Sequence, residues 1–121
     1  MSAPLAIRLF ISFFGSLFEI KNQSHWALLH SYESVLEKHH SSECHELLAD
    51  PTTNVISELS PRDKAWITSL LTKAILSTDM ALHKTLLDQM QVRIARNEPF
   101  DINDENDRRS LVCFILHCAG N

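Results

Sequence analysis

The chain has 121 residues, of which 45% are hydrophobic and 21% are charged, and its formal net charge at pH 7 is −4. This length allows one folded domain, and the acidic balance argues against nucleic acid as a partner, since nucleic-acid binding relies on a basic face. With only two glycines and four prolines, the composition disfavours turn-rich β architecture and predicts an all-α fold.

The N-terminal stretch Pro4–Phe18, PLAIRLFISFFGSLF, is the most apolar part of the sequence. It is shorter than the ~20 residues of a membrane-spanning helix and contains Arg8, so a transmembrane span is not expected. The main interpretation is an amphipathic or buried segment. The alternative is an interface, membrane-surface or targeting element.

The first predicted helix covers Tyr32–Ala49, where apolar residues such as Val35 and Leu36 recur at helical spacing and Pro51 follows the end. A second predicted helix begins at Ser60 and Pro61. The serine is a preferred N-cap, and proline at the first helical position loses no hydrogen bond.

Apolar residues continue at helical period from Pro61 to Ile94, a run much longer than the ~11 residues of an average helix. A joint is therefore predicted at residues 77–80, STDM, because serine, threonine and aspartate cap helices. Residues 97–107 form a predicted acidic loop. Residues 108–119 form a predicted helix that is apolar on nearly all sides, which indicates burial in a larger assembly.

Histidines and cysteines raise the question of a zinc site. His40 and Cys44 have the i, i+4 spacing of two ligands on one helix face, with His39 and His45 beside them. Zinc needs three or four ligands, and the sequence contains no HExxH motif, so solvated or packed histidines are the main interpretation. The three cysteines form no CxxC pair, which favours a reducing compartment and a cytoplasmic location over a disulfide framework.

Three segments in order, FEIKNQSHWALLHSYESVLEKHH, ELSPRDKAWITSLLTKAILSTDMALH and DRRSLVCFILHCA, resemble the catalytic domain of the class I cyclic-nucleotide phosphodiesterases. The resemblance covers residues 18–119. It implies a partial catalytic domain over residues 18–121, preceded by an apolar segment, residues 1–17, without resemblance. The implied fold is an all-α partial bundle of four or five helices.

The resemblance implies metal-dependent hydrolysis of cyclic AMP or cyclic GMP to the 5′-nucleotide, with zinc and magnesium as cofactors. By motif, Glu37 and His40 of SVLEKHH and Thr78 of STDM match positions that hold metal-bound waters. Met80 matches a pocket-lining position, and Asp79 is expected to cap the helix that begins there.

The departures from the family pattern concern the metal ligands themselves. The family takes them from upstream HNxxH and HD motifs and from the aspartate of HCAD, whereas this chain has neither motif and carries Gly120 at the aspartate position. We therefore expect this chain by itself to bind no metal cofactor and to be inactive. The alternative is a noncatalytic protein that self-associates or binds a helical partner through its apolar ends. A misplaced exon boundary at either end is a third interpretation.

Overall fold

The computed structural model describes residues 16–119, so residues 1–15 of the predicted apolar segment, residues 1–17, lie outside the described part. Two short helices, α2 (Ser16–Lys21) and α3 (His25–Leu29), precede four longer ones. These are α4 (Val35–Ala49), α5 (Pro61–Leu76), α6 (His83–Ala95) and α7 (Glu105–Ala119), with the short 3₁₀ helix η1 (Met80–Leu82) before α6. The described residues contain no β-strand, and the all-α prediction is confirmed.

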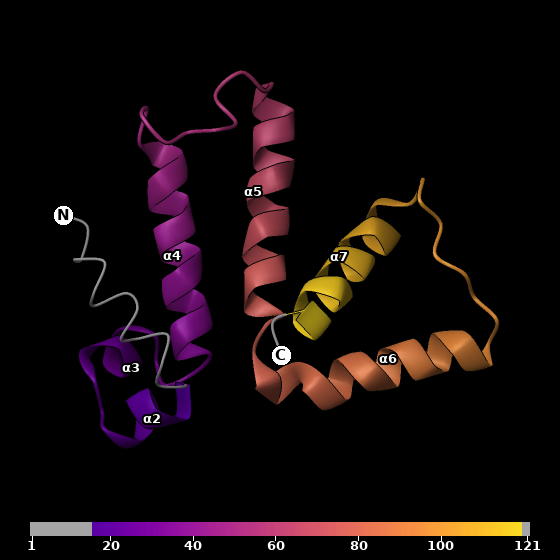
Figure 1. Cartoon of the computed structure of the whole chain (residues 1–121), viewed down its shortest axis with the longest axis horizontal. Coiled ribbons are helices and arrows are strands. Elements are labelled where there is room, and N and C mark those ends of the chain that lie inside the picture. The colour runs from indigo at the N-terminus through magenta and orange to yellow at the C-terminus, as the bar shows by residue number, and fades with distance from the viewer. Residues whose placement is uncertain (1–15, 120–121) are drawn as a thin grey trace.

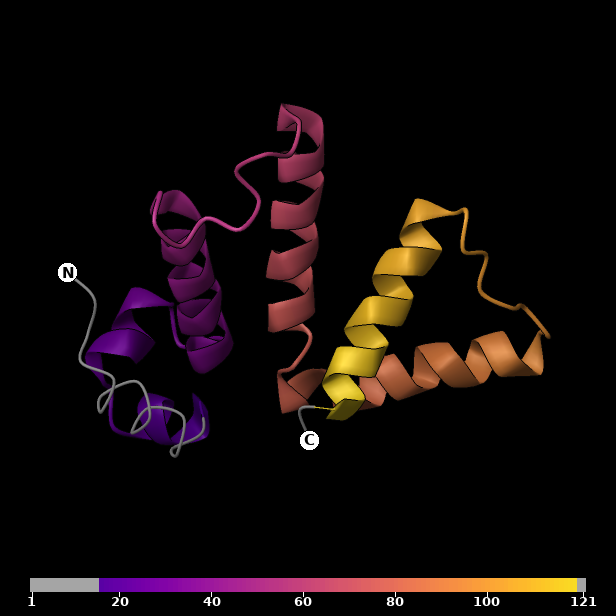
Figure 2. The same ribbon diagram turned by 45° about the horizontal axis from the view of Figure 1, so that its top comes forward.

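Helix α5 is the centre of this partial bundle. It packs antiparallel to α4 on one side and against α7 on the other, while α2 and α3 pack at the beginning of α4. Helix α6 begins below the lower end of α5, runs away from it to one side, and diverges from α7 towards its own C-terminus (Figure 1, Figure 2). Ala27, Val35, Leu36 and Ala74 are the buried apolar residues of the described chain, so its core is small.

Local signals set several helix ends as predicted. The Ser60 hydroxyl accepts the Asp63 amide at 3.1 Å and donates to the Asp63 carboxylate at 2.9 Å, with Pro61 in the first turn. Helix α4 ends at Ala49, two residues before Pro51, as the restricted backbone of a residue preceding proline requires. Both boundaries are confirmed.

Two predicted helix starts differ from the structure by three residues. Helix α4 begins at Val35 rather than Tyr32, because Tyr32 and Ser34 have φ values of 59° and 44°, in the left-handed region. Helix α7 begins at Glu105 rather than at residue 108, because the Asp104 carboxylate accepts the Asp107 amide at 2.9 Å and caps the helix earlier.

The last helix, which was predicted to be buried in a larger assembly, is largely exposed within this chain, and its burial elsewhere stays a prediction. In α7 only His117 is buried, while Leu111, Val112, Ile115 and Leu116 are 36% to 57% exposed. Of the helices that the structure describes, none is long and apolar enough to cross a bilayer.

Candidate functional site

The joint predicted at residues 77–80 is where four helices meet. Helix α5 ends at Leu76, and the Asp79 carboxylate accepts the Ala81 amide at 2.9 Å, which caps η1 as expected. The second oxygen of Asp79 accepts the Ser34 hydroxyl at 2.6 Å, although the two residues are 45 positions apart. This bond fastens the start of α4 to the joint.

The end of α7 reaches the same joint through His117. Its Nδ1 lies 2.7 Å from the Ser77 carbonyl oxygen, and its Nε2 lies 2.9 Å from Nδ1 of His83, the first residue of α6. The buried Ser77 hydroxyl donates to the carbonyls of Ala74 and Cys113. Polar contacts thus connect α4, α5, α6 and α7. The start of α4, the end of α5, the start of α6 and the end of α7 lie at the same end of the bundle (Figure 2).

The residues that the resemblance singled out lie on these connected elements. Glu37 is half-buried in the first turn of α4, and His40 is exposed in the second turn. Thr78 donates its hydroxyl to the Ile75 carbonyl at 2.6 Å, and Met80 is 54% exposed. The Ser34–Asp79 bond joins the two segments that carry them, whereas Gly120 lies outside the described residues.

The side chains that the structure describes do not fit a bound metal ion. Across residues 16–119, no three histidine, cysteine, aspartate or glutamate side chains come together as ligands could. His39 is buried with its ring 4.1 Å from that of Trp26, and His45 Nε2 lies 2.7 Å from the Thr72 hydroxyl of α5. These histidines of α4 therefore pack helices together, and no catalytic step can be derived through a metal here.

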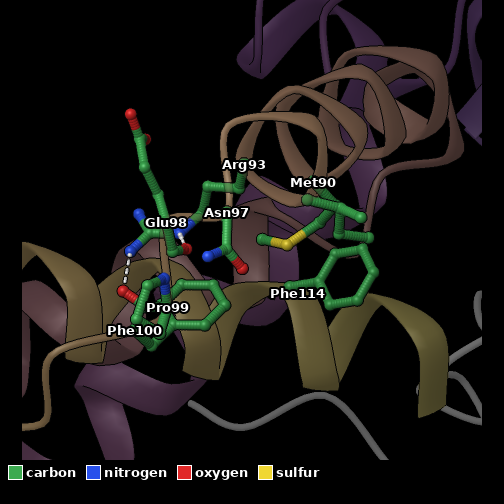
Figure 3. A pocket seen from close by; sticks show the side chains of 8 residues that line it. Met90, Arg93, Asn97, Glu98, Pro99, Phe100 and Phe114 are labelled. Atoms are coloured by element: carbon green, nitrogen blue, oxygen red, sulfur yellow. Dashed lines mark hydrogen bonds between the residues drawn. The ribbon is translucent and has the colours of Figure 1, made fainter.

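A pocket of about 420 Å³ that the sequence did not indicate lies between the end of α6, the following loop and α7 (Figure 3). Its walls are mostly apolar and aromatic, from Met90, Ile94, Pro99, Phe100 and Phe114, with polar groups from Arg93, Asn97 and Glu98. Asn97 has a φ of 52°, and the amides of Asn97 and Glu98 bond back to Ile94 and Arg93. This helix end turns the chain so that Phe100 faces α7.

Arg93 holds the loop beside this pocket. Its guanidinium donates to both carboxylate oxygens of Asp107, at 3.0 and 2.8 Å, and to the carbonyls of Glu98 and Pro99. It also lies 4.1 Å from the centre of the Phe100 ring. One side chain of α6 thus fixes the loop and the start of α7. The sequence showed that this loop is acidic. The spacing of residues along the chain did not show that Arg93 is the cation that binds it.

Acid should release this loop only below the ordinary aspartate range. The hydrogen bonds from Arg93, followed by that from the Asp101 amide, lower the pKa of Asp107 against the opposing effect of burial. A lowered pKa means that the stabilisation is present above the unfolded-state pKa and is lost as pH falls through the folded-state pKa. A carboxyl NMR titration should place the Asp107 midpoint below that of a typical aspartate. Arg93→Gln should raise it, and an unchanged midpoint in that variant would contradict the assigned cause.

Comparisons with known proteins agree with the motifs. A profile of the 3′5′-cyclic nucleotide phosphodiesterase family matches residues 14–120. The chain is similar to the probable 3′,5′-cyclic phosphodiesterase pde-1 of Caenorhabditis elegans, with 29% identity over 84% of this chain and 14% of the relative. It is also similar to the human high affinity cGMP-specific 3′,5′-cyclic phosphodiesterase 9A, with 27% identity over 88% of this chain and 17% of the relative.

Among solved structures, the phosphodiesterase domain of the RhoPDE fusion protein from the choanoflagellate Salpingoeca rosetta superimposes with a TM-score of 0.82 and 30% identity. That match covers 88% of this chain and 34% of the solved chain. The sequence thus spans about a third of that domain and a small part of its curated relatives. Because the family profile covers most of its length, this chain belongs to the 3′,5′-cyclic nucleotide phosphodiesterase family.

Proposed function

We propose that this chain is the central part of a phosphodiesterase catalytic domain whose complete form hydrolyses cyclic AMP or cyclic GMP to the 5′-nucleotide. The observation that carries the proposal is the match to the family over residues 14–120, together with the fold. The division into residues 1–17 and a partial catalytic domain at 18–121 belongs to the same proposal, as does a cytoplasmic location.

Within the complete domain, Glu37, His40 and Thr78 would orient waters next to the metal ions, and Met80 would line the nucleotide pocket. The bond between Ser34 and Asp79 supports this assignment, because it holds the start of α4 next to the segment that carries Thr78 and Met80. Zinc and magnesium would supply the attacking hydroxide in the complete domain. What this chain itself would supply to that site is the hydrogen-bonding groups of Glu37, His40 and Thr78, which would hold the waters in place.

The isolated chain is inactive under this proposal, because the part of the chain that the structure describes brings no three metal-ligating side chains together. Purified chain with zinc and magnesium should hydrolyse neither cyclic AMP nor cyclic GMP above a protein-free blank. Gly120→Asp, which restores the carboxylate that closes HCAD in the family, should remain equally inactive because the other ligands are still missing. Turnover together with stoichiometric metal uptake by either protein would overturn the proposal.

A second candidate function is supported by the exposed apolar side chains of α7. Leu111, Val112, Ile115 and Leu116 form unpartnered apolar surface, which marks association sites in soluble proteins. In this alternative the chain is a noncatalytic partner that associates with itself or with another helix. Sedimentation of the purified chain separates the candidates, since a concentration-dependent oligomer without turnover favours association and a monomer contradicts self-association.

A further inference from the structure

The loop before α4 has a strained backbone. Ser31, Tyr32 and Ser34 have φ values of 55°, 59° and 44°, in the left-handed region that favours glycine. A residue with a side chain keeps such a conformation only where the contacts around it outweigh the steric penalty. The start of α4 is therefore held by a contact that local backbone preference does not provide.

Ser34 lies at the N-cap of α4, but its side chain does not cap the helix. The N-cap serines of α3 and α5, Ser24 and Ser60, have extended backbones and accept the amide three residues further on, each at 3.1 Å. Ser34 makes no such bond, and its hydroxyl donates to the Asp79 carboxylate at 2.6 Å. An extended Ser34 with an ordinary cap would satisfy an amide of α4 without a left-handed residue. The observed arrangement thus gives up local stability for a distant contact.

This contact connects two segments to which site residues belong. One oxygen of Asp79 accepts the Ala81 amide at 2.9 Å and the other accepts the Ser34 hydroxyl, so the carboxylate is fixed at both oxygens. Thr78, the neighbour of Asp79 in sequence, is one of the residues proposed to orient waters. Glu37, another of them, lies three residues after Ser34 in the first turn of α4. The bond therefore constrains where Glu37 lies relative to Thr78.

We propose that Ser34 and Asp79 are positioning residues for the water-orienting side chains, an inference that rests on the function proposed above. They act through Glu37 and Thr78 and make no contact with the nucleotide themselves. Packing between α4 and α5 already joins the two helices. Apolar packing tolerates small shifts, whereas a short hydrogen bond to a doubly bonded carboxylate sets where α4 begins relative to residues 78–80. The left-handed conformation of Ser34 is retained because this placement requires it.

The test combines backbone N–H residual dipolar couplings with urea unfolding, both measured on the full chain. In the unaltered chain, the couplings of residues 31–37 and 77–82 should fit the structure in the same alignment frame as α5. Ser34→Ala and Ser34→Gly both remove the donor, so the couplings of these two segments should lose that fit while those of α5 keep it. Couplings that still fit in both variants would overturn the inference.

The same two variants separate positioning from stability. Glycine accommodates a left-handed backbone, so Ser34→Gly should unfold at a higher urea concentration than Ser34→Ala although neither keeps the bond. If the fit of the couplings returned in Ser34→Gly together with the stability, Ser34 would serve stability alone and the inference would be wrong.

Ser60→Ala is the matched control, since it removes an ordinary N-cap bond. It should lower the urea midpoint and leave the couplings of residues 31–37 and 77–82 unchanged. A loss of fit in those segments equal to that of Ser34→Ala would mean that any lost cap disturbs them, which contradicts a special role for Ser34.

Asp79→Asn tests the bond from its other end. The amide oxygen of asparagine can accept from Ala81 while its NH₂ group donates to the Ser34 hydroxyl, which is also an acceptor. The couplings of both segments should therefore keep their fit in Asp79→Asn and lose it in Asp79→Ala. Equal couplings in these two variants would overturn the inference even if a Ser34 variant fails to fold.

These measurements contain neither nucleotide nor metal. Their failure would contradict the positioning role and leave the family-based proposal of hydrolysis standing. Turnover with stoichiometric metal uptake by the chain would overturn the proposed function and leave the couplings unchanged, so the two failures are distinguishable.

Discussion

Arg93→Ala is expected to lower the free energy of unfolding by about 2–3 kcal/mol, because several interactions of one partly buried guanidinium are lost together. The carbonyls of Glu98 and Pro99 lose their donor, and the Phe100 ring loses the cation above it. The loop should then detach from α6, and the pocket between α6 and α7 should lose one wall. Urea unfolding followed by circular dichroism measures the change.

Arg96→Ala is the matched control for this prediction, since Arg96 is exposed at the end of the same helix. Its effect should stay within about 0.5 kcal/mol, as for ordinary surface substitutions. Arg93→Lys should retain most of the loss seen with alanine, because an ammonium cannot reproduce the two-pronged contact with Asp107 and the carbonyl bonds. Equal stability of Arg93→Lys and the unaltered chain would show that charge alone holds the loop.

His117→Ala is expected to destabilise the chain by about 2–4 kcal/mol. The substitution leaves a cavity at a fully buried position and removes the hydrogen-bond partner of the Ser77 carbonyl, and both effects are costly in an interior. Because Ser77 also bonds the Cys113 carbonyl, the contact between α5 and α7 should loosen with it. The midpoint of urea unfolding measures the effect.

Cys118→Ala serves as the control, since Cys118 is the exposed neighbour of His117 on the same helix. Its unfolding midpoint should be close to that of the unaltered chain. If both substitutions shift the midpoint equally, the end of α7 is sensitive to any change and the buried imidazole has no special role.

Some helix ends follow from adjacent residues, whereas others depend on contacts with distant parts of the chain. The start of α5 follows from Ser60, Pro61 and Asp63, which interact within one turn, so adjacent residues were enough to predict it. The start of α4 was predicted three residues early. Ser34 takes a left-handed backbone conformation there, and its hydroxyl bonds Asp79, far along the chain.

The candidate site likewise contains features that the sequence predicted and features that it did not. The motifs identified the family to which the chain belongs, and the joint at 77–80 lies where the capping residues predicted it. The roles that the resemblance gives to Glu37, His40, Thr78 and Met80 stay predictions. The part played by His83 and His117 was not predicted. A histidine in sequence is compatible with solvent, a metal or a packed interior, and the choice depends on which helix lies opposite.

By itself, the sequence determined the all-α class, the main helix breaks and the family, because helical period, caps and motifs act over a few residues or survive as recognisable strings. Tertiary structure alone decided that Arg93 clamps Asp107, that His117 pairs with His83 and that Ser34 bonds Asp79. Each of these contacts joins residues 14 to 45 positions apart. Their partners are selected by how the helices cross, and spacing along the chain does not encode that geometry.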